Sequence, residues 1–141
     1  MATRAFTLIE ILIVVVILGI MAAISVPQFA RASEEAEIGA ARDQLVKLRN
    51  ALSIYAMRNA NQFPASIAAG DGTWGELMGP YFKTGLPPKN LYVDPSKETT
   101  IVLGNTPPVT YDGTFAWMYD ASTGEVWAGG FGANDEPFPK P

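Results

Sequence analysis

Residues 11–26 read ILIVVVILGIMAAISV and contain no charged side chain. The apolar run begins at Phe6 and covers 21 positions, 6 to 26, with four interruptions: Thr7, Glu10, Gly19 and Ser25. A helix needs about 20 residues to cross the hydrocarbon core of a bilayer, which is about 30 Å thick. No face of this helix would be polar, which suits lipid or complete burial rather than the surface of a soluble domain. The stretch therefore predicts a helix that spans a membrane or is covered by other protein.

Two other interpretations of the N-terminus stay open. Ala30-Arg31-Ala32 before Ser33 resembles a signal-peptide cleavage site, and a plain one-pass anchor has the same length and composition. Against a signal peptide, the basic region holds only Arg4, and Glu10 lies at the head of the apolar run, where an unpaired acid is costly to bury. Because Arg4 precedes the span and acids follow it, the positive-inside bias favours a cytoplasmic N-terminus and an external domain.

An amphipathic helix is predicted to follow Pro27. Its apolar residues are spaced by 3, 4, 3, 4 and 3 positions, which places them on one face: Ile38, Ala41, Leu45, Leu48, Leu52 and Tyr55. The stripe runs for under three heptads, so we expect this face to pack against a sheet rather than in a coiled coil. The charged residues on the rest of the helix, Arg49 among them, are expected to be solvated.

The helix is expected to fade at residues 59–61 and to end before Phe63-Pro64. Residues 64–95 are rich in Gly and Pro, which predicts loops with a short helical turn near residues 74–78. Strands are predicted at residues 99–103, 115–119 and 125–128, and residues 120–124 are predicted to form a hairpin loop. In the second strand Phe115, Trp117 and Tyr119 would share one side, which predicts core positions.

The predicted fold class is α+β, with one long N-terminal helix whose amphipathic half packs on a small antiparallel sheet. We divide the chain into five predicted segments: a leader at 1–5, an apolar helix at 6–27, an amphipathic helix at 28–60, a loop-rich connection at 61–98, and the sheet with the C-terminal loop at 99–141.

Composition excludes several function classes. The chain has 10 basic and 14 acidic residues and a net charge of −4, with no basic patch dense enough for nucleic acid. It has no Cys and no His, which excludes disulfides, thiolate or imidazole metal sites, and catalytic triads that use His. Carboxylates with no pocket or spacing signal do not indicate an acid/base pair, so we expect no catalysis.

The string Ala5-Phe6-Thr7-Leu8-Ile9-Glu10, followed by the apolar run, resembles the processing motif of type IV prepilins and type II secretion pseudopilins. The resemblance implies cleavage between Ala5 and Phe6 by a prepilin peptidase, followed by N-methylation of Phe6. Glu10, Gly19 and Pro27 match the family's acidic, glycine and proline positions, which serve assembly. The family usually has Gly before the Phe, whereas this chain has Ala5, which is also small.

The resemblance implies a structural subunit of a pilus-like filament, most like a type II secretion pseudopilin. Such a subunit is stored in the inner membrane, with its globular domain in the periplasm, and assembles with copies of itself and other pilin-like subunits on an inner-membrane platform. The alternatives are a type IV pilus pilin for adhesion or DNA uptake, and an anchored binding or sensory module that never polymerises.

Calcium is a weaker expectation, implied by a C-terminal calcium loop in major pseudopilins. The candidate ligands are Asp112, Asp120 and Asp135, although no D-x-[DN]-x-[DN]-G spacing is present. The same residue types also form turns. Of the tryptophans, Trp117 is predicted to lie in the core, while Trp74 is left open between core and surface.

Overall fold

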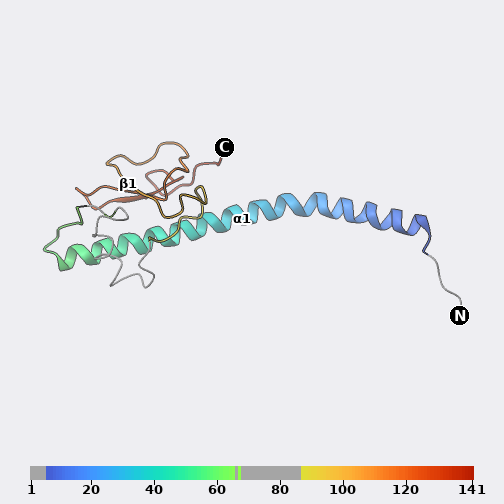
Figure 1. Cartoon of the computed structure of the whole chain (residues 1–141), viewed down its shortest axis with the longest axis horizontal. Coiled ribbons are helices and arrows are strands. Elements are labelled where there is room, and N and C mark those ends of the chain that lie inside the picture. The colour runs from blue at the N-terminus through green and yellow to red at the C-terminus, as the bar shows by residue number, and fades with distance from the viewer. Residues whose placement is uncertain (1–5, 66, 68–86) are drawn as a thin grey trace. The chain divides into compact units, whose positions relative to one another are not determined.

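The computed structural model describes residues 6–65, 67 and 87–141. Helix α1 (Leu8–Arg58) is followed by three short strands: β1 (Ile101–Leu103), β2 (Trp117–Tyr119) and β3 (Val126–Ala128). The chain divides into two compact units, Met1–Glu35 and Ala36–Pro141, and α1 contributes to both (Figure 1). The α+β class and the long N-terminal helix are therefore confirmed, whereas the predicted turn at 74–78 and Trp74 lie outside the described residues.

Helix α1 ends where the sequence predicts. Its last residue is Arg58, and Ala60 and Asn61 then take left-handed backbone conformations, with φ of 54° and 63°. The amide of Asn61 donates to the carbonyl of Ala56 over 2.8 Å, which satisfies one of the carbonyls left free at a helix end. The reversal turns the chain back along the helix, so that the sheet can pack on it.

The sheet has the order β1-β2-β3 and is mixed. The pairing of β2 with β3 is antiparallel, and the predicted hairpin loop is confirmed by the bond from the Asp120 amide to the Glu125 carbonyl, 2.9 Å. The pairing of β1 with β2 is parallel, with Ile101 opposite Trp117, so the prediction of an all-antiparallel sheet is wrong. The physical reason is the connection at 104–116, whose 13 residues are long enough to carry the chain back before β2 begins.

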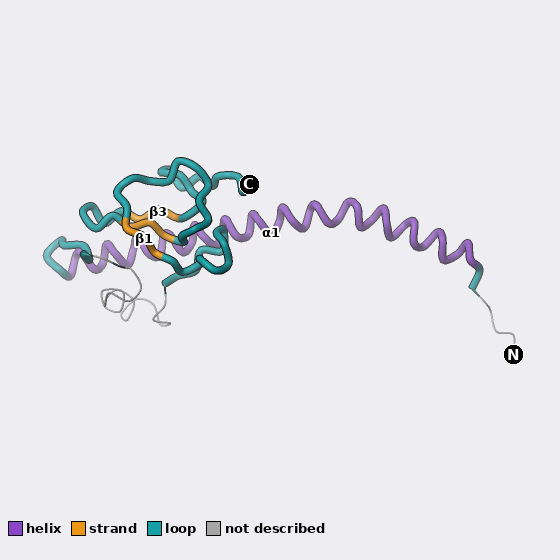
Figure 2. Tube along the Cα trace, turned by 45° about the horizontal axis from the view of Figure 1, so that its top comes forward, coloured by secondary structure: helices purple, strands orange, loops and turns teal. Residues whose placement is uncertain are grey.

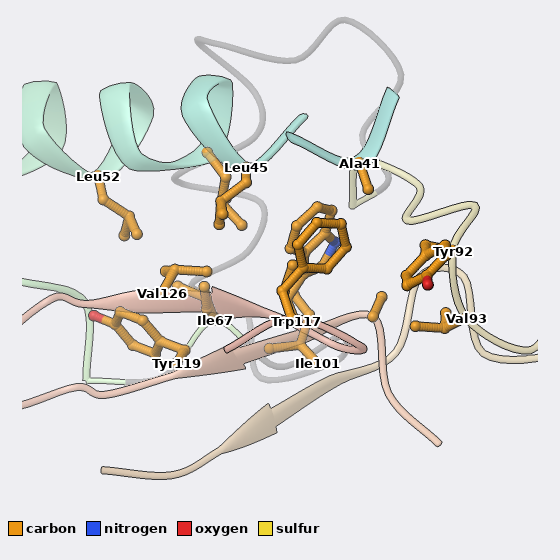
Figure 3. Close-up of a cluster of buried hydrophobic side chains, with 14 of the residues drawn as sticks. Ala41, Leu45, Leu52, Ile67, Tyr92, Val93, Ile101, Trp117, Tyr119 and Val126 are labelled. Atoms are coloured by element: carbon orange, nitrogen blue, oxygen red, sulfur yellow. The ribbon is translucent and has the colours of Figure 1, made fainter. Parts of the chain in front are cut away.

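The core of the unit Ala36–Pro141 lies between α1 and the sheet (Figure 2). The predicted stripe faces it: four members are buried and the outer two, Ile38 and Tyr55, are partly buried against them. Figure 3 shows Leu45 and Leu52 directed at the sheet, where Trp117 and Val126 meet them. Phe115, Trp117 and Tyr119 are all at most 4% exposed, as their alternation predicts.

Three buried polar groups attach loops to this core. The Trp117 indole donates to the carbonyl of Pro88 over 2.7 Å, and the Tyr119 hydroxyl donates to the carbonyl of Pro64 over 2.6 Å. The amide side chain of Asn90 donates to the carbonyls of Ala116 and Gly129 and accepts from the Tyr92 amide, each over 3.0 Å. No sequence signal singled out Asn90, which is fully buried and hydrogen-bonded in this way.

Candidate functional site

The most unusual surface of the described chain is the apolar side of the first unit. Every large apolar side chain from Phe6 to Phe29 is at least half exposed, including Ile13, Val16 and Ile20. Monomeric soluble proteins rarely expose apolar patches of more than a few hundred Å², so this surface requires a cover of lipid or protein. Among the described residues one helix, α1, is long and apolar enough to cross a membrane.

A capping box begins this helix. Thr7 precedes the first helical residue, Leu8, and its amide and hydroxyl both donate to Oε2 of Glu10, over 2.8 and 2.7 Å. In return the Glu10 amide approaches the Thr7 hydroxyl oxygen at 3.3 Å. The two side chains therefore satisfy amides that a helix start leaves without partners. The T-x-x-E spacing of Thr7 and Glu10 carries this signal, and our sequence reasoning missed it.

The capping box determines which hydrogen bonds the Glu10 carboxylate makes at the start of α1. Both bonds from Thr7 end on one carboxylate oxygen of Glu10, and both residues are exposed. The bonds from Thr7 leave Oε1 of this exposed carboxylate able to accept a hydrogen bond from a cation outside the chain. Cleavage before Phe6 would create a free amine one residue before Thr7 and would leave the Thr7 amide, and so the capping box, unchanged.

The remaining predicted residues are the processing pair, Ala5 and Phe6, and the assembly residues Gly19 and Pro27. Phe6 is 78% exposed, and Ala5 lies outside the described residues. A Cβ added at Gly19 would meet nothing within 4 Å, so no contact within the described chain requires a glycine there. Pro27 lies inside α1, which continues through it. The processing and assembly roles of these residues stay predictions.

Arg49 is only partly exposed and is held by hydrogen bonds, which corrects the prediction of a fully solvated charged face. Its guanidinium donates to both carboxylate oxygens of Asp135, over 2.6 and 2.9 Å, and to the carbonyl of Val126, over 3.2 and 2.8 Å. The physical reason is that β3 and the C-terminal segment lie beside this part of the helix and offer it acceptors. Sequence periodicity cannot reveal a partner 86 residues away.

The three calcium candidates have separate environments. Asp112 accepts from the amide and hydroxyl of Thr114, and Asp120 accepts in the same way from Ser122, so each forms a local turn. These bonds lower the pKa of Asp120, first through the Ser122 hydroxyl and then through the Ser122 amide. Asp135 pairs with Arg49. Within residues 6–65, 67 and 87–141 no group of three or more acidic side chains could hold a metal ion, and calcium binding stays an untested prediction.

Comparison with known proteins adds to this geometry. Residues 1–26 match the family model of the prokaryotic N-terminal methylation motif. The chain is 40% identical over 63 residues to the type II secretion system core protein G of Pectobacterium carotovorum, a match that covers 45% of this chain and 40% of the relative. It is 41% identical over 61 residues to the protein of the same name from Aeromonas hydrophila, covering 43% and 42% of the two chains.

The protein of the same name from Pseudomonas aeruginosa is 44% identical over 54 residues, with 38% of each chain covered. The matches thus span about two fifths of the length of these relatives. No solved structure matches the chain. The protein therefore carries the prokaryotic N-terminal methylation motif at the start of its exposed apolar helix, and part of the chain is similar to core protein G of type II secretion systems.

Proposed function

We propose that this protein is a structural subunit of a type IV pilus-like filament, most like a type II secretion pseudopilin, and not an enzyme. It would be stored in the inner membrane as a single-pass protein, with its N-terminus in the cytoplasm and residues 36–141 in the periplasm. A prepilin peptidase would remove residues 1–5 and methylate Phe6, and an inner-membrane platform would assemble the subunit with other pilin-like chains. The observation that carries the proposal is the uncovered apolar helix headed by Thr7 and Glu10.

The apolar surface argues for two successive environments. Covering an exposed Val, Leu or Ile side chain gains roughly 1 kcal/mol or more, so a helix with so many of them is stable only in lipid or against other chains. Lipid covers it in the stored state. In a filament the same helices of neighbouring subunits would cover one another, and no part of the surface would meet water.

Glu10 would set the alignment of neighbouring subunits when the helix moves from lipid into the filament. In the single chain its carboxylate is bonded to Thr7. The amine created at Phe6 has an ordinary pKa of about 7.7–8.0 and is cationic at neutral pH. A neighbour stacked with the right stagger would bring its amine to Glu10, whereas a misplaced neighbour would leave two charges buried and unpaired.

Gly19 and Pro27 would allow the helix to change shape. Gly costs about 1 kcal/mol in a helix interior, and Pro removes one backbone hydrogen bond. A Cβ at Gly19 would find open space, so a glycine serves no packing need within the described chain. We propose that residues 19–27 lose helicity when the subunit leaves the bilayer.

The proposal is tested by separating the charge of Glu10 from its capping role. Glu10→Gln keeps an acceptor for Thr7 and removes the charge, while Thr7→Val removes the hydroxyl and leaves the charge and the backbone donor. We expect Glu10→Gln and Glu10→Val to be cleaved and inserted normally but to form no filaments. Thr7→Val should form them, as should Glu35→Gln, a control at an exposed acid of the same unit.

Electron microscopy of sheared or periplasmic filaments, with membrane fractionation of the same cells, provides the readout. Filaments at normal levels from Glu10→Gln would contradict the pairing of Glu10 with a neighbour's amine. A non-polymerising anchored module would be indicated if the unchanged protein, expressed with its own assembly platform, stays in the membrane and forms no filament.

A further inference from the structure

Arg49 lies where three parts of the unit Ala36–Pro141 meet. It belongs to α1, its Nε and Nη2 donate to the carbonyl of Val126 in β3, and its Nη1 and Nη2 donate to the carboxylate of Asp135. One planar guanidinium therefore makes four hydrogen bonds to two elements distant in sequence. A lysine ammonium cannot reproduce this fork geometry.

Asp135 stands at the tip of a small loop. Phe131 and Pro137 form an antiparallel bridge, the Gly132 amide donates to the carbonyl of Glu136 over 2.9 Å, and the Asp135 amide donates to the carbonyl of Gly132 over 3.1 Å. Asp135 has φ of 59°, in the left-handed region that Asp and Asn enter more readily than other residues with a side chain. We call residues 131–137 the C-terminal loop.

A second arginine lies beside the same loop. Arg42 donates to the carbonyl of Asp135 over 3.2 Å and lies 3.7 Å from the carboxylate of Glu136. Two arginines thus already lie beside the acids of the C-terminal loop, and a divalent cation at Asp135 would be repelled by the guanidinium of Arg49, which is within hydrogen-bonding distance.

We propose that Arg49 is the internal cation that fixes the C-terminal loop to α1 and β3, so that the fold of residues 36–141 does not depend on calcium. Of the three calcium candidates, Asp135 is the one to which this proposal applies most directly. Both of its carboxylate oxygens, which a metal ion would need as ligands, accept hydrogen bonds from Arg49. An isolated ion pair whose side chains are about one third exposed contributes little. Arg49 differs because the pair is bidentate and because its loss also leaves the Val126 carbonyl without this donor.

Thermal unfolding of the full chain in detergent tests the proposal, with near-UV circular dichroism as a probe of the buried aromatic core. The melting temperatures measured in calcium chloride and in a chelator should agree within about 1 °C. An ion that stabilised the folded state by binding it would raise the melting temperature in calcium chloride. Arg49→Met should lower the melting temperature by about 5 °C or more, whereas Lys47→Met, at an exposed position two residues away, should change it little.

A double-mutant cycle identifies the partner. Asp135→Asn keeps a residue that tolerates the left-handed backbone and removes the charge, so its cost should combine with that of Arg49→Met less than additively. Limited proteolysis of Arg49→Met should produce new cleavages within the C-terminal loop. If Arg49→Met does not accumulate, Arg49→Lys and Asp135→Asn give the same comparison with smaller shifts.

Two results would overturn the proposal. One is a rise of several degrees in the melting temperature of the unchanged chain when calcium replaces the chelator, abolished by Asp135→Asn. The other is an Arg49→Met protein as stable, and as resistant to proteolysis at 131–137, as Lys47→Met.

Discussion

The first and second units use the same helix in opposite ways. From Leu8 to Phe29 the helix exposes every large apolar side chain, whereas four stripe residues of the same helix, Ala41, Leu45, Leu48 and Leu52, are at most 1% exposed beneath the sheet. Val16 and Val46 are almost equally exposed, at 53% and 54%, yet one lies in a continuous apolar surface and the other beside charged residues. The first unit therefore needs a cover from outside the chain, while the second forms its own core.

The largest contrast is expected for a charge placed in each region. Val16→Lys puts an ammonium near the middle of the apolar stretch, at a cost of about 2.5–3.5 kcal/mol for insertion into a bilayer. We expect the variant to be lost from the membrane fraction or degraded. Val46→Lys should be retained and should unfold as the unchanged protein does. Equal membrane levels of the two variants would contradict the assignment of the first unit to lipid.

Two glycines provide the next contrast, measured by denaturant unfolding with tryptophan fluorescence. A Cβ at Gly129 would lie 1.9 Å from the carbonyl oxygen of Phe115, so Gly129→Ala should destabilise the second unit by about 3 kcal/mol. The methyl group added by Gly19→Ala would contact no atom, and alanine is about 1 kcal/mol more favourable than glycine inside a helix. Because Gly19 lies in the first unit, the unfolding of the second unit should not change. A neutral Gly129→Ala would show that the backbone directly after β3 does not pack against Phe115 as described.

Asn90 tests whether the second unit depends on buried polar contacts as well as on apolar packing. Asn90→Ala leaves the carbonyls of Ala116 and Gly129 and the amide of Tyr92 without this partner, and should cost about 2 kcal/mol. Asn50→Ala, at an exposed position of α1, should be neutral or slightly stabilising. Equal free energies of unfolding for the two variants would show that the Asn90 bonds contribute nothing.

The smallest effect concerns acid pH. Hydrogen bonds from Ser122 lower the pKa of Asp120, and those from Ser96 lower the pKa of Asp94 in the same way. An aspartate whose pKa is lower in the folded state stabilises the fold above its unfolded value of about 3.9, and this contribution is lost as the pH falls below that value. Asp120→Asn keeps an acceptor for Ser122 and should therefore lose less stability between about pH 6 and pH 3 than the unchanged protein. Identical losses for both proteins would contradict the role of the Asp120 charge.

The parts of the fold that were predicted correctly rest on local patterns. The apolar run, the 3-4 stripe, the end of the helix near Arg58 and the hairpin loop at 120–124 all follow from spacing within a few residues. The parallel pairing of β1 with β2 could not be predicted, because it depends on how 13 residues of loop return the chain. The role of Arg49 could not be predicted either, because its acceptors in β3 and the C-terminal loop are distant in sequence.

The N-terminus of α1 is a different case. The motif from Ala5 to Glu10 was found as a family resemblance, and the comparison with residues 1–26 supports it. The capping box of Thr7 and Glu10 was missed, although T-x-x-E before an apolar run is a readable signal. The neighbour that Glu10 is proposed to meet is a second chain, and no pattern within one sequence specifies its position.

The most direct test of this account is the intact mass of the protein isolated from the membrane of cells that contain the prepilin peptidase. The expected chain begins at Phe6, lacks residues 1–5 and carries one added methyl group, so that the whole apolar helix is retained. A mature chain that begins at Ser33, and has therefore lost that helix, would contradict it.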